Sequence, residues 1–458
     1  MPMRRHLIHA RAAGAALVLS AGLIACDNRI LRVTAPDVVL PSALTSASAL
    51  PTATAAVYGD FGYAYTGDAG DDEGIIEDGG LLGDEFHSSD TFNTRIQIDQ
   101  RSILNDNAQN EVDFRRIQRA RTTAEFAVTQ YQHLEPNAAL EAEAFSFVGF
   151  AYLLAGENYC SGIPFSNVLP SGQIQYGALE TSAQVFTDAA ARFDSAITAL
   201  GKDTISGDAG QIPIEQSLAA VGLGRALVDG GNYAAAATAV ASVPTDFVFD
   251  QGYSQSSSRT SNGVFEYVQE EHRYSVADQE GGVGLPFRSA NDPRVLWSDA
   301  GTLGFDARDS LFLQLKYTSY NAPIPLATGI EARLIQAEAE LAANGADANF
   351  FLYLDQARTQ SYIANGAKTT APSITAVPAG MTPVTFLFQE RAFDLWLTAH
   401  RLGDMRRLLT QYHMGVNSVF PNGSYAPRPG NFGPDVDLPI PVTEEGNPSF
   451  KTCDNTIP

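Results

Sequence analysis

The feature that most constrains the fold is a helical period of apolar residues, repeated in consecutive segments of the chain. Apolar side chains recur at i, i+3, i+4 and i+7 in the segments 111–133, 137–155 and 181–200. Thr181, just before the third run, is suited to cap the first turn of a helix. Because each segment carries an apolar stripe on one face only, the segments are expected to pack against one another. The pattern predicts a mostly α fold.

The segment Gln216–Pro244 is more specific. Five of its residues fall at the offsets of a tetratricopeptide repeat: Leu223, Gly224, Gly231, Tyr233 and Ala236. Small residues at these offsets let two antiparallel helices approach closely, and glycine lets the chain turn between them. A second helix pair is predicted in 330–362, and a third begins at Val384 and runs beyond Leu409. We therefore expect tetratricopeptide-like helical hairpins stacked into an α-α superhelix.

The helical pattern is interrupted twice. Between 245 and 328 it gives way to short irregular or β-prone segments such as GVFEYV and LFLQLKY, which predicts an insertion between helical repeats at about 111–244 and 329–411. Loops carried by a rigid scaffold are a common place for binding sites. The Gly- and acid-rich segment 67–90 shows no helical period and is predicted to be a long surface loop. Residues 56–458 are expected to form a single domain.

The N-terminus has the features of an export signal. Three arginines precede an apolar run from Ala12 to Ala25, which is too short for a permanent membrane span and is followed by Cys26. The Leu-Ile-Ala-Cys sequence resembles a bacterial lipobox, so we predict a signal peptide over 1–25, lipidation of Cys26 and a flexible tether over 26–55. Two or more acyl chains, at ~0.8 kcal/mol per methylene, anchor a protein stably. The alternative is an ordinary signal peptide with an incidental cysteine.

Composition narrows the classes of function. A formal net charge of −23 repels phosphate backbones, so nucleic-acid binding is not expected. A hydrophobic content of 45% and an aromatic content of 10% nevertheless predict a folded core. Besides Cys26 the chain has only Cys160 and Cys453, which in an exported protein can form one disulfide or remain two separate thiols.

Five blocks of sequence resemble the SusD/RagB family of surface nutrient-binding lipoproteins. They are Glu141–Phe165, Asn291–Val295 (NDPRV), Leu315–Tyr317 (LKY), Glu390–Leu408 (ERAFDLWLTAHRLGDMRRL) and Leu438–Phe450 (LPIPVTEEGNPSF). The resemblance implies a tetratricopeptide-type scaffold on the outer membrane, facing outside the cell. It also implies an oligosaccharide or peptide ligand and a TonB-dependent outer-membrane transporter as partner.

The chain departs from the family pattern at several positions. Asp394 and Thr398 stand where the family has Glu, and Ala399 stands where it has Gly before His400. The ending also lacks the family's Gln-Asn-Pro-Gly-Tyr. These departures bear on ligand and partner more than on fold.

Two sets of charged residues invite a chemical interpretation. The first comprises Glu390, Arg391, His400, Arg401 and Asp404. No Ser or Cys nucleophile motif accompanies them, so we predict a buried structural network of ion pairs, and no enzyme activity. The second comprises Asp68, Asp71, Asp72, Glu73, Glu77 and Asp78. Their spacing does not fit a helix–loop–helix calcium loop, so we predict a solvated acidic loop with no metal, and the sequence indicates no cofactor.

Glycan binding requires aromatic platforms flanked by planar hydrogen-bonding side chains. Candidates in the predicted loops are Tyr63, Tyr65, Phe86, His87, Asn93, Arg95, Arg273, Tyr274, Arg288, Asn291, Trp297, Tyr317 and Tyr320. The second tryptophan, Trp396, lies in an amphipathic segment and is predicted to be in the core.

The main expectation is capture of an oligomeric nutrient, an oligosaccharide or else a peptide, without chemistry. A tetratricopeptide-type adaptor for another protein on the cell envelope is the first alternative. A secreted glycan hydrolase is the second, although no pair of carboxylates is singled out by the sequence. The acidic charge favours neutral or cationic ligands over polyanions.

Overall fold

The computed structural model describes residues 46–458 except 71, 135–136, 170, 202–209, 361–368 and 427. The predicted signal peptide, Cys26, Asp71 of the acidic segment and the tether up to residue 45 lie outside these residues. The chain divides into a unit of residues 1–46 and a compact unit of residues 47–458, and the second is described below.

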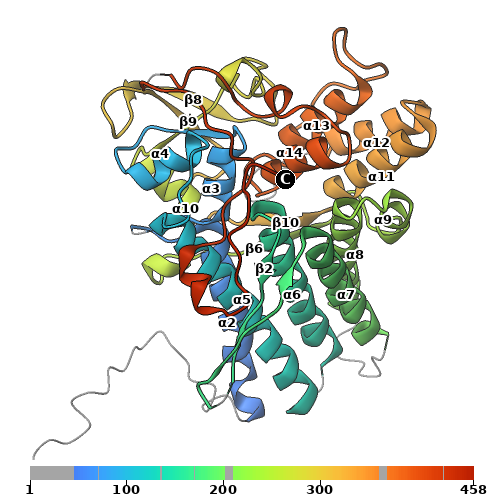
Figure 1. Cartoon of the computed structure of the whole chain (residues 1–458). Coiled ribbons are helices and arrows are strands. Elements are labelled where there is room, and N and C mark those ends of the chain that lie inside the picture. Colours follow the sequence, from blue (N-terminus) through green and yellow to red (C-terminus); the bar gives the residue numbers. More distant parts are fainter. Residues whose placement is uncertain are drawn as a thin grey trace, which may run out of the picture. The chain divides into compact units, whose positions relative to one another are not determined.

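Five long helices pack in sequence order along one side of this unit (Figure 1). They are α2 (Leu50–Thr66), α5 (Ala108–His133), α6 (Ala138–Asn158), α7 (Ser182–Leu200) and α8 (Ile212–Asp229). The capping side chains explain where they begin. Asn107 caps α5, Asn137 caps α6, and Thr181 forms a capping box with Gln184 at the start of α7. The three helices predicted from periodicity are confirmed.

The predicted tetratricopeptide-like pair is formed by α8 and α9 (Tyr233–Ala239). A Cβ added at Gly224 would lie 2.4 Å from Cγ1 of Val240, so only glycine permits this approach. Gly231 has a φ of +74°, which glycine adopts readily in the turn between the helices. The small residues therefore have the packing role that their spacing predicted.

The remaining helices follow at the C-terminal side of the array. They are α11 (Gly329–Asn344), α12 (Ala348–Arg358), α13 (Pro383–Asp394) and α14 (Arg401–Thr410). Trp396 is fully buried, as predicted, but it lies in the turn between α13 and α14 rather than in a helix. Leu397 and Ala399 have φ values of +55° and +60° there. This left-handed backbone is what glycine favours, and it accounts for the Gly that the family pattern places at position 399.

Strands are short. In the described residues they form five two-stranded antiparallel sheets: β1 (Phe86–Ser88) with β7 (Tyr274–Val276), β2 (Ile163–Pro164) with β5 (Leu179–Glu180), β3 (Asn167–Val168) with β4 (Ile174–Gln175), β6 (Val248–Gln251) with β10 (Ile324–Thr328), and β8 (Trp297–Leu303) with β9 (Ser310–Gln314). The 3₁₀ segments are η2 (Ala47–Ala49), η3 (Ser258–Thr260), η5 (Glu280–Gly282), η7 (Val416–Ser418) and η8 (Val442–Gly446).

The segment 245–328 contains β6 to β10, in keeping with an insertion of short strands. The β interpretation of GVFEYV is wrong, because these residues form α10 (Gly263–Phe265) and a π-helical turn, η4 (Glu266–Glu270). The reason is a local cap: Oδ1 of Asn262 accepts a hydrogen bond from the Phe265 amide at 3.1 Å and starts a helical turn.

The prediction of a solvated loop over 67–90 is wrong. This segment forms α3 (Ile75–Leu82) and β1, is followed by α4 (Asn93–Asp99), and is buried over most of its described length. Two of its acids contact distant arginines: Arg95 contacts Glu73, and Arg116 reaches Asp72 at 3.1 Å. Burial raises the pKa of Glu77 and of Asp78, which favours their uncharged forms. The helix α2 also begins inside the predicted tether, at Leu50, which is buried.

Blocks that lie far apart in sequence meet at the turn after α13. Arg294 donates to Glu390 at 2.8 Å and to Asp394 at 3.0 Å. Lys316 donates to the main-chain carbonyl oxygen of Trp396. The Tyr317 hydroxyl donates to the main-chain carbonyl oxygen of Leu397 at 3.1 Å. The NDPRV, LKY and ERAFDLW blocks thus form one buried assembly.

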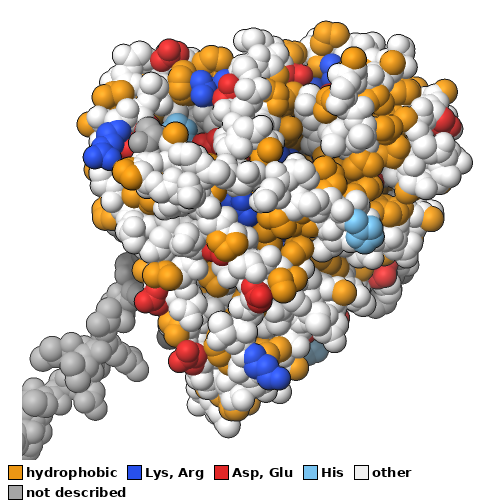
Figure 2. All heavy atoms as spheres, turned by 45° about the horizontal axis from the view of Figure 1, so that its top comes forward, with side chains coloured by type: hydrophobic (Ala, Val, Ile, Leu, Met, Phe, Trp, Pro, Cys, Tyr) orange, Lys and Arg blue, Asp and Glu red, His pale blue; other side chains and the backbone are white. Residues whose placement is uncertain are grey.

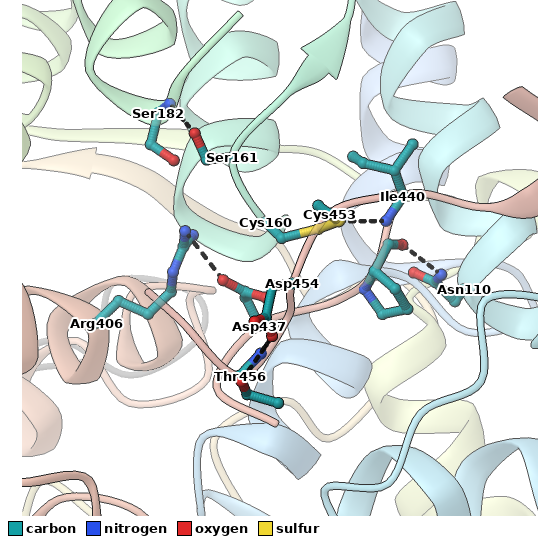
Figure 3. Close-up of a disulfide and its surroundings, with 11 residues drawn as sticks. Asn110, Cys160, Ser161, Ser182, Arg406, Asp437, Ile440, Cys453, Asp454 and Thr456 are labelled. Carbon is teal, nitrogen blue, oxygen red and sulfur yellow. Dashed lines mark hydrogen bonds and ion pairs between the residues drawn. A yellow bond between two sulfur atoms is a disulfide. The ribbon is translucent and has the colours of Figure 1, made fainter. Parts of the chain in front are cut away.

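The C-terminal segment crosses the end of α6, where Cys160 and Cys453 form a disulfide (Figure 3). Around this bond Asn110 donates to the Pro439 carbonyl at 2.8 Å, and Arg406 points toward Asp437 at 3.3 Å. Among the described helices α6 is long and apolar enough to cross a membrane, but 72% of that stretch is buried inside the protein, as expected of a core helix.

Candidate ligand-binding surface

Five of the predicted ligand-binding residues belong to the core. Tyr65, Phe86, Arg95, Tyr274 and Tyr317 are each at most 6% exposed. The Tyr65 hydroxyl donates to the Thr398 carbonyl at 2.9 Å, and that of Tyr274 to Glu73 at 2.7 Å. Their assignment to a binding surface is therefore corrected. It failed because Tyr65, Phe86, Arg95 and Tyr274 lie in helices and strands with inward-facing side chains. Tyr317 does lie between strands, but its hydroxyl is bound to the Leu397 carbonyl in the core.

Trp297 and Arg288 do lie at the surface, together with Phe312. The rings of Trp297 and Phe312 meet edge to face at 5.8 Å between centroids. The guanidinium carbon of Arg288 lies 3.6 Å from the Phe312 centroid and 5.8 Å from that of Trp297. All three are partly exposed, and Asn291, three residues beyond Arg288, is exposed. We call Trp297, Phe312 and Arg288 the first aromatic cluster.

A second aromatic cluster was only partly indicated by the sequence. Phe92 is 54% exposed and Phe305 is 48% exposed. Large apolar side chains exposed close together often mark a binding surface, and these two share one neighbour. Arg273 is that neighbour, with its guanidinium carbon 5.2 Å from the Phe92 centroid and 4.2 Å from the Phe305 centroid. Its Nη1 also lies 3.1 Å from both carboxylate oxygens of Asp90. The exposed Asn93 follows Phe92.

The turn that carries Phe305 is held in place before any ligand arrives. The Phe305 amide donates to the His272 carbonyl at 2.9 Å, and the Asp306 amide to the Ser89 carbonyl at 2.9 Å. Arg428 bridges the same two segments, donating to Asp306 at 2.7 Å and to the Ser88 carbonyl at 2.8 Å. Because the rings sit on a fixed frame, binding at this surface requires little ordering.

Acidic groups lie beneath this turn around His87. Its two ring nitrogens lie 3.8 Å from Glu280 and 3.9 Å from Asp309. Burial lowers the pKa of His87 to about 4, so the imidazole is neutral at pH 7. Burial, together with a hydrogen bond to Asp306, raises the pKa of Asp309 to about 7. The groups beneath the surface therefore add less negative charge to it than their number suggests.

Tyr63 and Tyr320 are held by other parts of the chain. The guanidinium carbons of Arg116 and Arg259 lie 3.6 and 4.7 Å from the ring centroid of Tyr63. The ring of Tyr320 packs edge to face on Phe265 with centroids 4.8 Å apart. Both rings therefore already pack against side chains of the protein.

The charged residues of the last helices form buried ion pairs. Arg391 donates to Asp404 at 2.7 Å, and His400 lies 3.2 Å from Glu331. Arg401 donates to Asp84 at 2.9 Å, while Glu390 accepts from Arg294 at 2.8 Å. Glu390, Arg391, His400, Arg401 and Asp404 are all at most 5% exposed. Their geometry ties helices together and presents no reactive group to solvent.

Two hollows open among the helices. A groove of about 700 Å³ lies between α9 and α11, and a pocket of about 300 Å³ lies between α7 and α14. Figure 2 shows hydrophobic side chains gathered in a hollow on its right side. Six of the thirteen residues that line the groove are alanines, and the others include Tyr233, Glu340 and Tyr353.

The fold and this surface define a class: a helical-repeat scaffold that carries preformed aromatic–arginine clusters on loops and short strands. No family model and no curated protein matches the sequence. Solved structures do match. A surface glycan-binding protein from Bacteroides uniformis superposes with a TM-score of 0.64 at 13% identity, over 89% of this chain and 99% of that one.

A SusD/RagB family protein from Bacteroides thetaiotaomicron gives a TM-score of 0.62 at 12% identity, over 86% of this chain and 94% of its own. A SusD-like carbohydrate-binding protein from Bacteroides vulgatus gives 0.54 at 15% identity, over 78% and 83%. The chain has the SusD-like fold.

Proposed function

We propose that this protein is a member of the SusD/RagB family that binds an oligosaccharide at the two aromatic clusters. It then passes the ligand to a TonB-dependent outer-membrane transporter. The observation that carries the proposal is the pair of exposed aromatic–arginine clusters around β8 and β9, on a fold whose solved relatives include proteins named as glycan-binding.

The chemistry of the surface fits a neutral sugar. Aromatic rings cover the apolar face of a sugar ring, and the guanidinium groups of Arg273 and Arg288 offer planar arrays of donors to hydroxyl groups. The net charge of −23 slows the approach of polyanions and weakens their binding. An extended peptide with neutral side chains is the second ligand class that such a surface accepts.

The proposed location rests on the lipobox-like sequence. Acylation of Cys26 would tether the domain to the outer membrane, with the domain outside the cell. Mass spectrometry of the purified protein tests this directly: acyl chains on the N-terminal peptide of the wild-type chain, and none in the Cys26→Ser variant, are expected. Co-purification with a transporter barrel tests the partner.

Isothermal titration against a panel of neutral polysaccharides, anionic polysaccharides and peptides tests the ligand. Binding heat without released reducing sugar supports capture, whereas product formation would show a hydrolase. The double variant Phe92→Ala/Phe305→Ala is expected to weaken binding by about tenfold or more, at ~0.5–1.5 kcal/mol per lost stacking contact. Tyr176→Ala is the matched control, since Tyr176 is 45% exposed but lies in the β3–β4 region. Equal loss in both variants contradicts the proposed site.

A further inference from the structure

The hairpin formed by β3 and β4 exposes large apolar side chains to solvent. Val168 is 71% exposed, Leu169 38%, Ile174 48% and Tyr176 45%. Val168 and Ile174 are cross-strand partners, and Leu169 and Tyr176 directly follow the two strands. We call these four residues the apolar hairpin. A two-stranded ribbon has no core of its own to bury them. Clustered exposed apolar residues of this kind mark an interaction surface.

The sequence around the hairpin is free of charge. No Asp, Glu, Lys or Arg occurs between Glu157 and Glu180, in a chain of net charge −23. A surface for binding a charged partner would carry complementary groups, and a solvated hairpin would carry charges for solubility. Neutral apolar residues with a tyrosine are instead typical of segments that lie at the boundary between lipid headgroups and acyl chains.

The hairpin and the start of α2, where the chain enters the domain, lie at the same end of α5. Gln118 donates to the Pro164 carbonyl at 2.8 Å, and Arg121, one turn further along α5, donates to the Ser166 carbonyl at 2.6 Å. The hairpin therefore runs toward the C-terminal end of α5. There Thr54, in the first turns of α2, hydrogen-bonds the Tyr131 hydroxyl. Figure 1 shows both at the lower end of the domain, away from β8 and β9.

The length of chain before the domain sets how far it can lie from the proposed lipid anchor. Cys26 lies twenty residues before Ser46, a length of chain that spans at most about 70 Å. If Cys26 is acylated, as the proposed function has it, the end of the domain nearest the anchor carries the apolar hairpin. We infer that the apolar hairpin inserts into the interfacial layer of the membrane as a second contact beside the lipid.

The test is made on the acylated, full-length mature protein in vesicles of phosphatidylcholine. An environment-sensitive fluorophore is attached at Leu169→Cys or at Ile174→Cys, and for the control at Leu352→Cys. Leu352 is 51% exposed and lies on α12. Nitroxides on the lipid acyl chains are expected to quench the label at 169 and 174 and not at 352, with no dependence on salt. Equal quenching at all three positions, or at none, overturns the inference.

A second measurement separates this inference from the proposed anchor. The mature chain with Cys26→Ser is mixed with the same vesicles, with and without Val168→Ser, Ile174→Ser and Tyr176→Ser. The triple variant is expected to lower the vesicle partition coefficient by about tenfold or more, because the apolar area that enters the lipid is lost. If mass spectrometry finds no lipid on Cys26 but partitioning still depends on the hairpin, the anchor fails and the inference stands.

The opposite outcomes are equally clear. An acylated protein whose hairpin labels stay unquenched keeps the anchor and refutes the inference. Labels that become shielded only when a co-purified transporter barrel is present also refute it, and assign the hairpin to that protein contact instead. Glycan titrations on the same samples report whether the aromatic clusters work independently of the hairpin.

Discussion

Arg401 donates from Nε to Oδ1 of Asp84 at 2.9 Å, and so joins the turn after α3 to the first turn of α14 across more than three hundred residues. The Asp84 side chain is fully buried, and its other oxygen accepts the Leu285 amide at 2.9 Å. The pair therefore holds three distant segments together.

Removing one partner is predicted to be costly. Arg401→Met leaves Asp84 buried without its counter-ion, and the free energy of unfolding is expected to fall by about 3–5 kcal/mol. Urea unfolding followed by circular dichroism measures this. The double variant Asp84→Asn/Arg401→Met is expected to recover part of the loss, because no unpaired charge remains. A double variant as unstable as the sum of both single variants would show that the pair does not couple.

The disulfide offers a second prediction. Cys160 and Cys453 are 293 residues apart in sequence, so their bond restricts the unfolded chain strongly. On the chain-entropy model the contribution to stability is about 6 kcal/mol. The variant Cys160→Ala/Cys453→Ala is expected to show a lower denaturation midpoint, and wild type under reducing conditions the same change. Limited proteolysis should then release the C-terminal segment first. Without the disulfide this segment is held to α6 and α14 by noncovalent contacts, such as the Tyr159–Leu438 bridge and the Arg406–Asp437 pair. Identical midpoints would contradict a role for the bond in stability.

A third prediction concerns pH. Burial raises the pKa of Glu85 to about 8, against the opposing effects of the Leu397 amide, Arg401 and Lys316. In the unfolded chain the group titrates near 4.5. Between these values the folded protein holds a proton that the unfolded chain has lost. This group therefore stabilises the fold fully below about pH 4.5, and its contribution falls by about 1.4 kcal/mol per pH unit until about pH 8.

Glu85→Gln removes that titration and keeps an acceptor for the Leu397 amide, which Glu85 binds at 2.8 Å. The difference in unfolding free energy between variant and wild type is expected to move in favour of the variant from pH 5 to pH 8. Glu445→Gln is the control, because Glu445 lies in an exposed 3₁₀ turn. The same pH profile in both variants would exclude Glu85 as the source.

The helical array followed from the sequence because helix periodicity and capping are local. Thr181 and its box partner Gln184 are three residues apart, and the apolar stripe of α7 needs no knowledge of the rest of the chain. The segment around α3 did not follow from the sequence. Its short apolar run IIEDGGLL is interrupted by Glu77 and Asp78, whose pKa values are raised by burial, so that their uncharged forms are favoured. Just before this run, Glu73 and Asp72 pair with Arg95 from α4 and Arg116 from α5. These contacts come from other helices, so the local sequence pattern does not reveal them.

The binding surface was recoverable only in part for the same reason. Trp297 stood out because it is one of two tryptophans and lies in a segment without helical period. Phe92 and Phe305 lie more than two hundred residues apart, and only the docking of the 304–309 turn on Ser89 and His272 exposes them side by side around Arg273. Tyr65 and Tyr274 are aromatic as well, yet both side chains face inward. The sequence shows which residues are aromatic, and the tertiary packing decides which of these side chains are exposed.

The fourth prediction separates the shape of Arg273 from its charge. Its guanidinium carbon lies 5.2 and 4.2 Å from the centroids of two exposed rings while the group pairs with Asp90, and a lysine keeps the charge but not the planar shape. If the ligand is held by the stacked array of Phe92, Arg273 and Phe305, Arg273→Lys is expected to weaken glycan binding by about five- to tenfold, from the loss of about 1 kcal/mol of stacking and planar hydrogen bonding. Arg308→Lys is the matched control, because Arg308 is exposed in the same turn as Phe305.

Isothermal titration of both variants at one ionic strength gives the comparison, and thermal unfolding checks that neither is destabilised. A loss confined to Arg273→Lys assigns the planar side chain to the ligand. Equal losses would mean that the effect does not depend on the contact between Arg273 and the two phenylalanines, because both substitutions keep the positive charge, and they would contradict the proposed array. Two unchanged variants would move the site to the first aromatic cluster, where Trp297→Ala is then the decisive substitution.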